Sequence, residues 1–177
     1  MADRWYELGG NDIQLGLGAF KMKINLVCVG KIKEKYFTDA VSEYQKRLSR
    51  FADFKIIELP EYPPKTQSKA DISASLSAEG KKMLSELKGY VVATAIDGEM
   101  LSSEELAALI NKKFSDGYGE ITFLIGGSNG TDPEILKKAD KRVSFGRVTY
   151  PHQLMRVILA EQIYRAGSIL NNLPYHK

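Results

Sequence analysis

The residues of this chain that could do chemistry gather around two glycine-rich bends in residues 120–156. The first bend, IGGSNG, ends an apolar run at 121–125, and the second, FGR at 145–147, ends a run at 143–145. Glycine permits positive φ and lets a ligand approach the main chain closely. If the two runs are neighbouring parallel strands, their carboxyl ends form a crevice, the usual ligand position in α/β folds. The sequence therefore predicts a ligand crevice walled by main chain.

A plainer interpretation stays open for the first bend. IGGSNG could be only a tight connection from a strand to a helix, which is the commonest use of such sequences. Two such bends close together in sequence, with Arg147 in the second, favour a ligand site.

Side-chain signatures of familiar enzyme classes are scarce. The sequence has no G-x-x-x-x-G-K-[ST], H-E-x-x-H or C-x-x-C motif. With two histidines and one cysteine, a metal site has little support, and we expect none. The cysteine, Cys28, lies in the apolar run INLVCVG, which favours a buried structural thiol over a nucleophile. One cysteine also excludes an internal disulfide and is typical of a reducing compartment.

Length and composition are those of a single globular domain: 177 residues, 44% hydrophobic and 27% charged. No apolar run approaches the ~20 residues needed to span a bilayer, so we expect no membrane partner. The net charge is only +3, but residues 137–177 hold eight Lys and Arg against two acids. That local excess suits an anionic partner such as RNA phosphate, and a solvated helix face balanced by acids elsewhere explains it equally well.

Strand-like and helix-like segments alternate along the chain. Apolar runs predict strands, and amphipathic stretches predict helices between them. The strands are expected at residues 23–30, 54–59, 90–96, 121–125 and 143–145, and the helices at 35–50, 70–87, 104–114, from 131 onward, and 151–170. Such alternation predicts an α/β fold with a mostly parallel sheet and helices on both faces.

Several boundaries carry local signals. Ser102 with Glu105 has capping-box spacing, and so does Thr131 with Glu134. Residues 97–99, Asp-Gly-Glu, are expected to form a turn after the third strand. The proline-rich segment 60–68 is a loop that either connects two elements on the surface, which is the commoner case, or folds over a substrate.

The two ends of the chain differ from its middle. Residues 1–21 are glycine-dense and lack hydrophobic periodicity, so we interpret them as a non-native or miscalled leader that is poorly ordered. The closing helix, 151–170, is apolar on more than one side. Its second apolar side is covered either within the monomer or in a symmetric dimer, and we favour the dimer because a sheet buries only one side.

Three segments together carry a family resemblance: IGGSNG, SFGRVTYPHQLMR and the terminal PYHK. They are similar to those of the bacterial ribosomal RNA large-subunit pseudouridine N3-methyltransferases, small enzymes of the SPOUT class. The resemblance covers residues 22–177. It implies a single SPOUT domain there with a C-terminal deep trefoil knot, which periodicity alone would argue against. It also implies a cytoplasmic homodimer that uses S-adenosylmethionine to methylate N3 of a pseudouridine in 23S rRNA on the assembled ribosome.

The cofactor contacts follow from the resemblance too. They are expected at Thr94, Gly126, Phe145, Gly146, Arg147, Val148, Thr149 and Tyr150. Thr94 departs from the leucine expected there, which puts the fine packing in doubt rather than the binding. Since the sulfonium already activates the methyl group, such an enzyme need only align donor and acceptor and exclude water, which agrees with the lack of side-chain signatures.

The acceptor implied by the resemblance is a weakly acidic imide N–H. Its candidate partners are His152, Arg156, Tyr175, His176 and the terminal Lys177. Arg147 or Arg156 could stabilise an imide anion, and His152 or His176 could accept the proton. His152 could equally be a structural residue at a helix start, and His176 part of a disordered tail. We hypothesise that residues 175–177 close over the crevice of the same or the partner subunit.

Two rival functions remain at this stage. One is a non-enzymatic nucleotide- or RNA-binding α/β module whose crevice holds a regulatory ligand. The other keeps the methyltransferase and gives it a transfer RNA ribose as its target.

Overall fold

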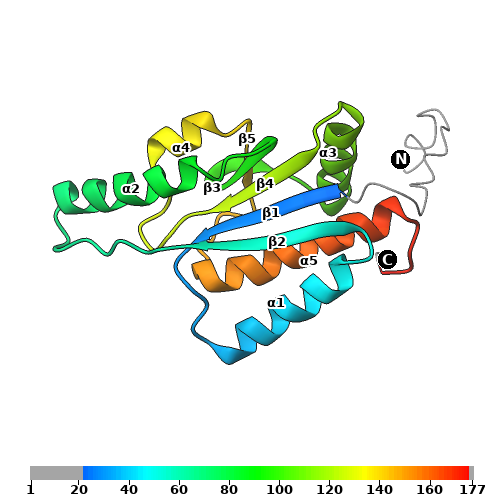
Figure 1. The fold of residues 1–177 in the computed structure, drawn as a ribbon, viewed down its shortest axis with the longest axis horizontal. Coiled ribbons are helices and arrows are strands. Elements are labelled where there is room, and N and C mark those ends of the chain that lie inside the picture. The colour runs from blue at the N-terminus through cyan, green and yellow to red at the C-terminus, as the bar shows by residue number, and fades with distance from the viewer. Residues whose placement is uncertain (1–21, 176–177) are drawn as a thin grey trace.

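The computed structural model describes residues 22–175; residues 1–21 and 176–177 lie outside the described part. The expectations for the leader and for His176 and Lys177 therefore fall outside it as well. Within 22–175, five strands and five helices alternate strictly along the chain (Figure 1). The strands are β1 (Met22–Val29), β2 (Ala52–Leu59), β3 (Tyr90–Met100), β4 (Glu120–Ile125) and β5 (Lys141–Ser144). The helices are α1 (Lys35–Leu48), α2 (Lys69–Leu84), α3 (Ser103–Ser115), α4 (Pro133–Lys138) and α5 (His152–Leu170).

The five strands form one parallel sheet in the order β2-β1-β4-β3-β5. Its central strand β4 is buried at every residue but the first, because a parallel sheet has helices over both faces. One face carries a core shared with α1, α3 and α5, and the other a smaller core shared with α2 and α4. The predicted α/β fold with a parallel sheet and helices on both faces is confirmed.

Helix boundaries follow local chemistry in most places. The capping box of Ser102 and Glu105 is confirmed at the start of α3. At α4 the prediction was wrong by one residue: Asp132, not Thr131, accepts the N–H of Glu134 at 2.9 Å. A carboxylate is a stronger hydrogen-bond acceptor than a threonine hydroxyl, and its negative charge is favourable at a helix N-terminus.

The expected turn at residues 97–99 is also corrected. β3 continues to Met100, with a shift of register in which both Thr94 and Glu99 lie opposite Val143. The chain bulges between those two residues and returns to pair with β5. Gly98 permits this, since a Cβ there would lie 2.7 Å from the backbone of Val143. The bulge matters because residues 94–97 border the cavity described below.

Helix α5 crosses beneath the sheet between α1 and α3. Met155, Leu159, Ile163 and Ala166 are buried in the larger core, and each large side chain buried in this way stabilises the fold by about 1.5–3 kcal/mol. Cys28 is fully buried on β1, and burial raises the pKa of its thiol to about 12, so the structural interpretation is confirmed. None of the helices in residues 22–175 is long and apolar enough to cross a bilayer.

Candidate active site

Both glycine bends border one cavity of about 810 Å³ at the carboxyl edge of the sheet. The cavity is lined by residues 94–97, 125–131, 143–146 and 148–152, together with Leu136 and Met155. These segments lie within or directly after β3, β4 and β5, which are neighbours in the sheet. The crevice predicted from the sequence is therefore present, because parallel strands bring the ends of distant segments together.

The first bend is a turn closed on itself. The Gly130 N–H donates to the Gly127 carbonyl at 3.0 Å, and Gly130 has φ +94°. A Cβ on Gly126 would collide with the Gly130 carbonyl, so this glycine is required by the turn itself rather than by ligand approach. The spacing G-x-S-x-G also matches a nucleophile elbow, but Ser128 lacks the positive φ of that strained turn, and its Oγ lies 3.4 Å from the Glu61 carboxylate.

The second bend is fixed by Ser144. Its hydroxyl accepts the Gly146 N–H at 3.3 Å and donates to the Gly146 carbonyl at 3.1 Å. Gly146 has φ +122°, and a Cβ built on it would meet no atom within 4 Å. Glycine at 146 is therefore favoured by its positive φ and not by crowding, and this residue borders the cavity.

Of the eight residues expected to contact the cofactor, all but Arg147 border the cavity. Seven border the cavity: Thr94, Gly126, Phe145, Gly146, Val148, Thr149 and Tyr150. Arg147 is exposed and is not among the lining residues. The hydroxyl of Thr94 donates to the Leu124 carbonyl at 2.9 Å, so it ties β3 to β4. Because that bond uses the hydroxyl hydrogen, threonine in place of the expected leucine adds little free polarity to the cavity.

His152 is the first residue of α5 and borders the cavity, half-buried. Burial lowers the pKa of its imidazole below the ordinary value, the charge of Arg156 lowers it further, and Glu61 opposes the shift. The neutral ring is therefore the stable form at pH 7 and can accept a proton.

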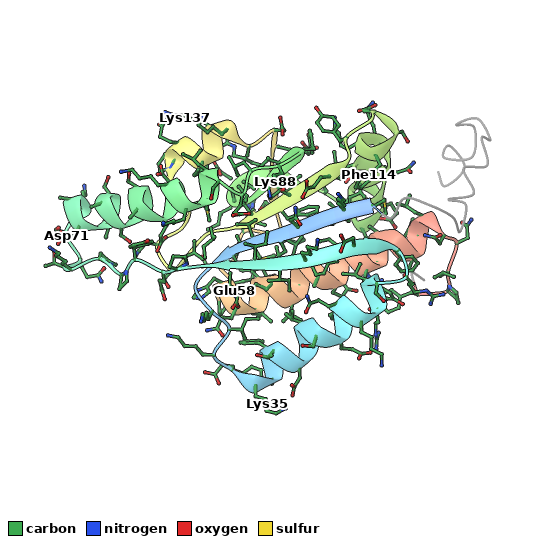
Figure 2. All side chains as sticks on the ribbon, viewed as in Figure 1. Lys35, Glu58, Asp71, Lys88, Phe114 and Lys137 are labelled. Atoms are coloured by element: carbon green, nitrogen blue, oxygen red, sulfur yellow. The ribbon has the colours of Figure 1, made fainter. Side chains whose placement is uncertain are left out.

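Arg156 lies one turn further along α5 but is fully buried. Its Nη1 donates to Glu58 Oε1 at 2.8 Å, and its Nη2 donates to the carbonyls of Val29 and Gly30 at 2.7 and 2.9 Å. Figure 2 shows Glu58 at the carboxyl end of β2. Arg156 is not a lining residue, and these contacts give its guanidinium a bracing position between β1, β2 and α5 rather than access to an acceptor.

Tyr175 lies at the other end of α5, which is about 27 Å long for its 19 residues. Its ring packs on Tyr164 with centroids 4.8 Å apart, and its hydroxyl donates to Glu161 Oε1 at 3.2 Å. Burial and the neighbouring Tyr44 and Glu161 raise the pKa of its phenol, so the group stays protonated. Tyr175 is not among the residues that line the cavity, so within one chain the structure does not bring it to the site.

Two acidic residues near the bends were not predicted from the sequence. Glu61 lies in the loop after β2, where composition gives no signal of a role. Glu79 lies on α2 and is 6% exposed. A signal for Glu79 did exist, because Ser75, Glu79 and Met83 are spaced four apart and share the buried face of α2. Residues 22–175 contain no group of His, Cys, Asp and Glu side chains suited to a metal ion.

The family model described as "Predicted SPOUT methyltransferase" matches residues 22–176. The chain therefore belongs to the SPOUT methyltransferase family. Among its curated relatives is the ribosomal RNA large subunit methyltransferase H of Limosilactobacillus fermentum, 51% identical over 159 residues, which cover 88% of this chain and all of the relative. The protein of the same name from Lactobacillus acidophilus is 52% identical over the same shares of both chains.

Solved structures of more distant proteins share the fold. A probable methylase family protein from Haemophilus influenzae Rd KW20 aligns with a TM-score of 0.52 at 14% identity, over 88% of this chain and 71% of that one. A probable methyltransferase from Bordetella pertussis Tohama I aligns with the same TM-score at 10% identity, over 82% and 95%.

Proposed function

We propose that this protein is an S-adenosylmethionine-dependent methyltransferase that acts on N3 of a pseudouridine in 23S rRNA within the assembled ribosome. The observation that carries the proposal is the cavity walled by two glycine bends in a chain about half identical to ribosomal RNA large subunit methyltransferases H. The alternative of a non-enzymatic binding module has no support from the family or from these relatives.

The cavity suits the cofactor in shape and charge. Among residues 22–175, no lysine or arginine lines it, which favours a ligand that carries a positive sulfonium. Ser144 already bonds the N–H and C=O of Gly146, so the adenine edge would meet main-chain groups of residues 148–150. A Cβ built on Gly146 would meet no other atom within 4 Å beyond its chain neighbours. Ile96 and Val148 border the cavity with 63% and 60% of their surfaces exposed, and a bound ligand would cover them. When bound, S-adenosylmethionine supplies a methyl group that is already activated.

The protein's own part is to position the acceptor and remove its proton. His152, neutral at the cavity wall, is the side chain placed to accept the imide proton. Arg147, exposed beside the cavity, is placed to meet the imide anion or an RNA phosphate. Arg156 then acts through its brace on Val29, Gly30 and Glu58 rather than on the acceptor.

The site is completed by a second copy of the chain. Tyr175 sits at the far end of α5, so the tail at 175–177 reaches a cavity most directly in a partner subunit. Leu154, Val157 and Ile158 remain partly exposed along α5, and a cytoplasmic homodimer would cover them. α5 also returns beneath the sheet to contact α1 although β5 lies at the opposite edge. With the family membership, that path supports the deep trefoil knot.

Two measurements test this proposal. Calorimetry should show binding of S-adenosylmethionine and S-adenosylhomocysteine and none of ATP or GTP; the reverse preference would refute the cofactor. Mass spectrometry of ribosomal and transfer RNA from a deletion strain should show one methylpseudouridine lost from 23S rRNA. Loss of a ribose methyl from transfer RNA would instead assign a different substrate.

A further inference from the structure

Glu79 carries a carboxylate on the buried face of helix α2. Arg156 and Glu79 are the two buried charged side chains in residues 22–175, and Arg156 is bonded to Glu58. Burying a carboxylate costs several kcal/mol unless its oxygens are used. Oε1 of Glu79 accepts the backbone N–H of Tyr62 at 3.1 Å. Tyr62 belongs to the loop between β2 and α2, which is not part of either glycine bend.

The other side of the same carboxylate faces the first glycine bend. A Cβ built on Gly127 would lie 3.1 Å from Oε2 and 3.5 Å from Oε1 of Glu79. Gly127 is the residue whose carbonyl closes the turn with Gly130. A Cβ at 127 would crowd both the Glu79 carboxylate and Val29 Cγ1, each 3.1 Å away, so Glu79 lies directly against the first corner of the turn.

The neighbouring residue extends this contact to the end of the turn. A Cβ on Gly80 would lie 2.8 Å from the Cβ of Asp132, the residue that caps α4. Consecutive residues of α2 thus contact both ends of the segment 127–132. Met83 of the same helix packs in the smaller core, and Glu79 and Gly80 place the preceding turn of α2 against this segment.

The loop after β2 is held by the same face of α2. Tyr62 gives its N–H to Glu79 and accepts the Ser75 hydroxyl with its carbonyl, so both of its backbone groups are bound by α2. Glu61, one residue earlier, lies 3.4 Å from the Ser128 hydroxyl of the turn. The loop and the glycine turn therefore contact each other directly and through Glu79.

We propose that Glu79 is a positioning residue of the cofactor site, whose buried carboxylate locks the glycine turn at 126–130 to the loop around Tyr62. The inference rests on the proposed function in taking that turn as a cofactor wall. It assigns α2 the task of keeping the wall in its binding shape. It also gives the loop at 60–64 a route by which substrate contact alters cofactor binding.

The test compares Glu79→Ala with Glu79→Gln, which keeps one acceptor oxygen in nearly the same place. Ile110→Ala is the matched control, because Ile110 is equally buried but belongs to α3 on the opposite face of the sheet. Binding of S-adenosylhomocysteine is measured by calorimetry, and hydrogen exchange is followed at Tyr62 and at residues 126–131.

The alanine variant should bind about tenfold more weakly and exchange faster at both segments, as expected for a lost hydrogen bond to a charged group. The glutamine variant should stay within about threefold of the unchanged protein. The control should lose thermal stability yet keep its affinity. Unchanged affinity and exchange in Glu79→Ala, or an equal loss of affinity in the control, would overturn the inference. If the unchanged protein binds no cofactor, the proposed function fails, and the exchange rates alone still decide whether Glu79 links the two segments.

Discussion

The two ends of helix α5 serve different purposes. At its N-terminal end, His152 borders the cavity and Arg156 is buried among the ends of β1 and β2. At its C-terminal end, Tyr164 and Tyr175 pack together, and Glu161 bonds both the Tyr175 hydroxyl and Arg165. The first end places His152 at the cavity and Arg156 in a buried polar contact, whereas the second end is an aromatic cluster with an ion pair beside it.

This difference shows why a set of motifs in one chain need not form one site in one subunit. His152, at the start of α5, and Tyr175, beyond its end, are separated by a helix of about 27 Å, which no side chain can span. In the proposed dimer, a site that uses both residues takes them from two copies of the chain. Substitutions at the two ends of the helix should therefore differ in their effects on methylation and on stability.

The largest effect is expected from deleting residues 175–177. Methylation should fall on the order of 10³-fold, while S-adenosylmethionine affinity stays nearly unchanged, because Tyr175 lies beyond the C-terminal end of α5 and does not line its own cavity. Mixed dimers give the sharper result. Chains without the tail, combined with His152→Ala chains, should regain activity if the tail acts on the partner's cavity, and should stay inactive if it acts on its own.

Arg156→Met should destabilise the fold by about 3 kcal/mol, because the carbonyls of Val29 and Gly30 and the carboxylate of Glu58 lose their cation. Urea unfolding measures this loss. Arg147→Met is the matched control, since Arg147 is exposed, and its stability should change by less than about 0.5 kcal/mol. A stable Arg156→Met protein with lost turnover would restore Arg156 to the chemistry.

His152→Ala should lower kcat about 100-fold with little change in cofactor affinity, as expected for loss of a proton acceptor. In the unchanged protein, kcat should rise with pH as the imidazolium loses its proton, with its inflexion below pH 6.5, because the pKa of His152 is lowered. The variant should lack that inflexion. The same shift makes the fold less stable in acid, since below about pH 6.5 the unfolded chain takes up the proton more readily. An unchanged pH profile in the variant would exclude His152 as the base.

Tyr175→Phe should have the smallest effect. It keeps the ring contact with Tyr164 and loses only the hydrogen bond to Glu161, so stability should fall by about 1 kcal/mol or less. Methylation should stay within a few-fold if Tyr175 anchors the tail and leaves the chemistry to residues beyond it. A drop comparable to that of the tail deletion, with unchanged stability, would make the hydroxyl itself catalytic.

The sequence by itself determined the elements and the positions of the bends. Apolar runs and amphipathic spacing depend on neighbours a few residues away, so the strict alternation of strands and helices was predictable. Local capping chemistry fixed the start of α3 for the same reason, and the glycines at 126–130 and 146 marked where the chain bends. The family resemblance added which bends bear on the cofactor.

Only the tertiary structure decided which residues are free to act. Contacts between distant segments decide three of these cases. They bury Arg156, they bond the Thr94 hydroxyl to a neighbouring strand, and they place Glu79 between two loops. The bulge of β3 around Gly98 depends likewise on pairing with Val143. The residue type and its spacing in the sequence tell which functional group it carries and which face of a helix or strand it lies on. Whether that group is bonded to another residue or free to meet a ligand depends on strand order and packing, which local patterns do not encode.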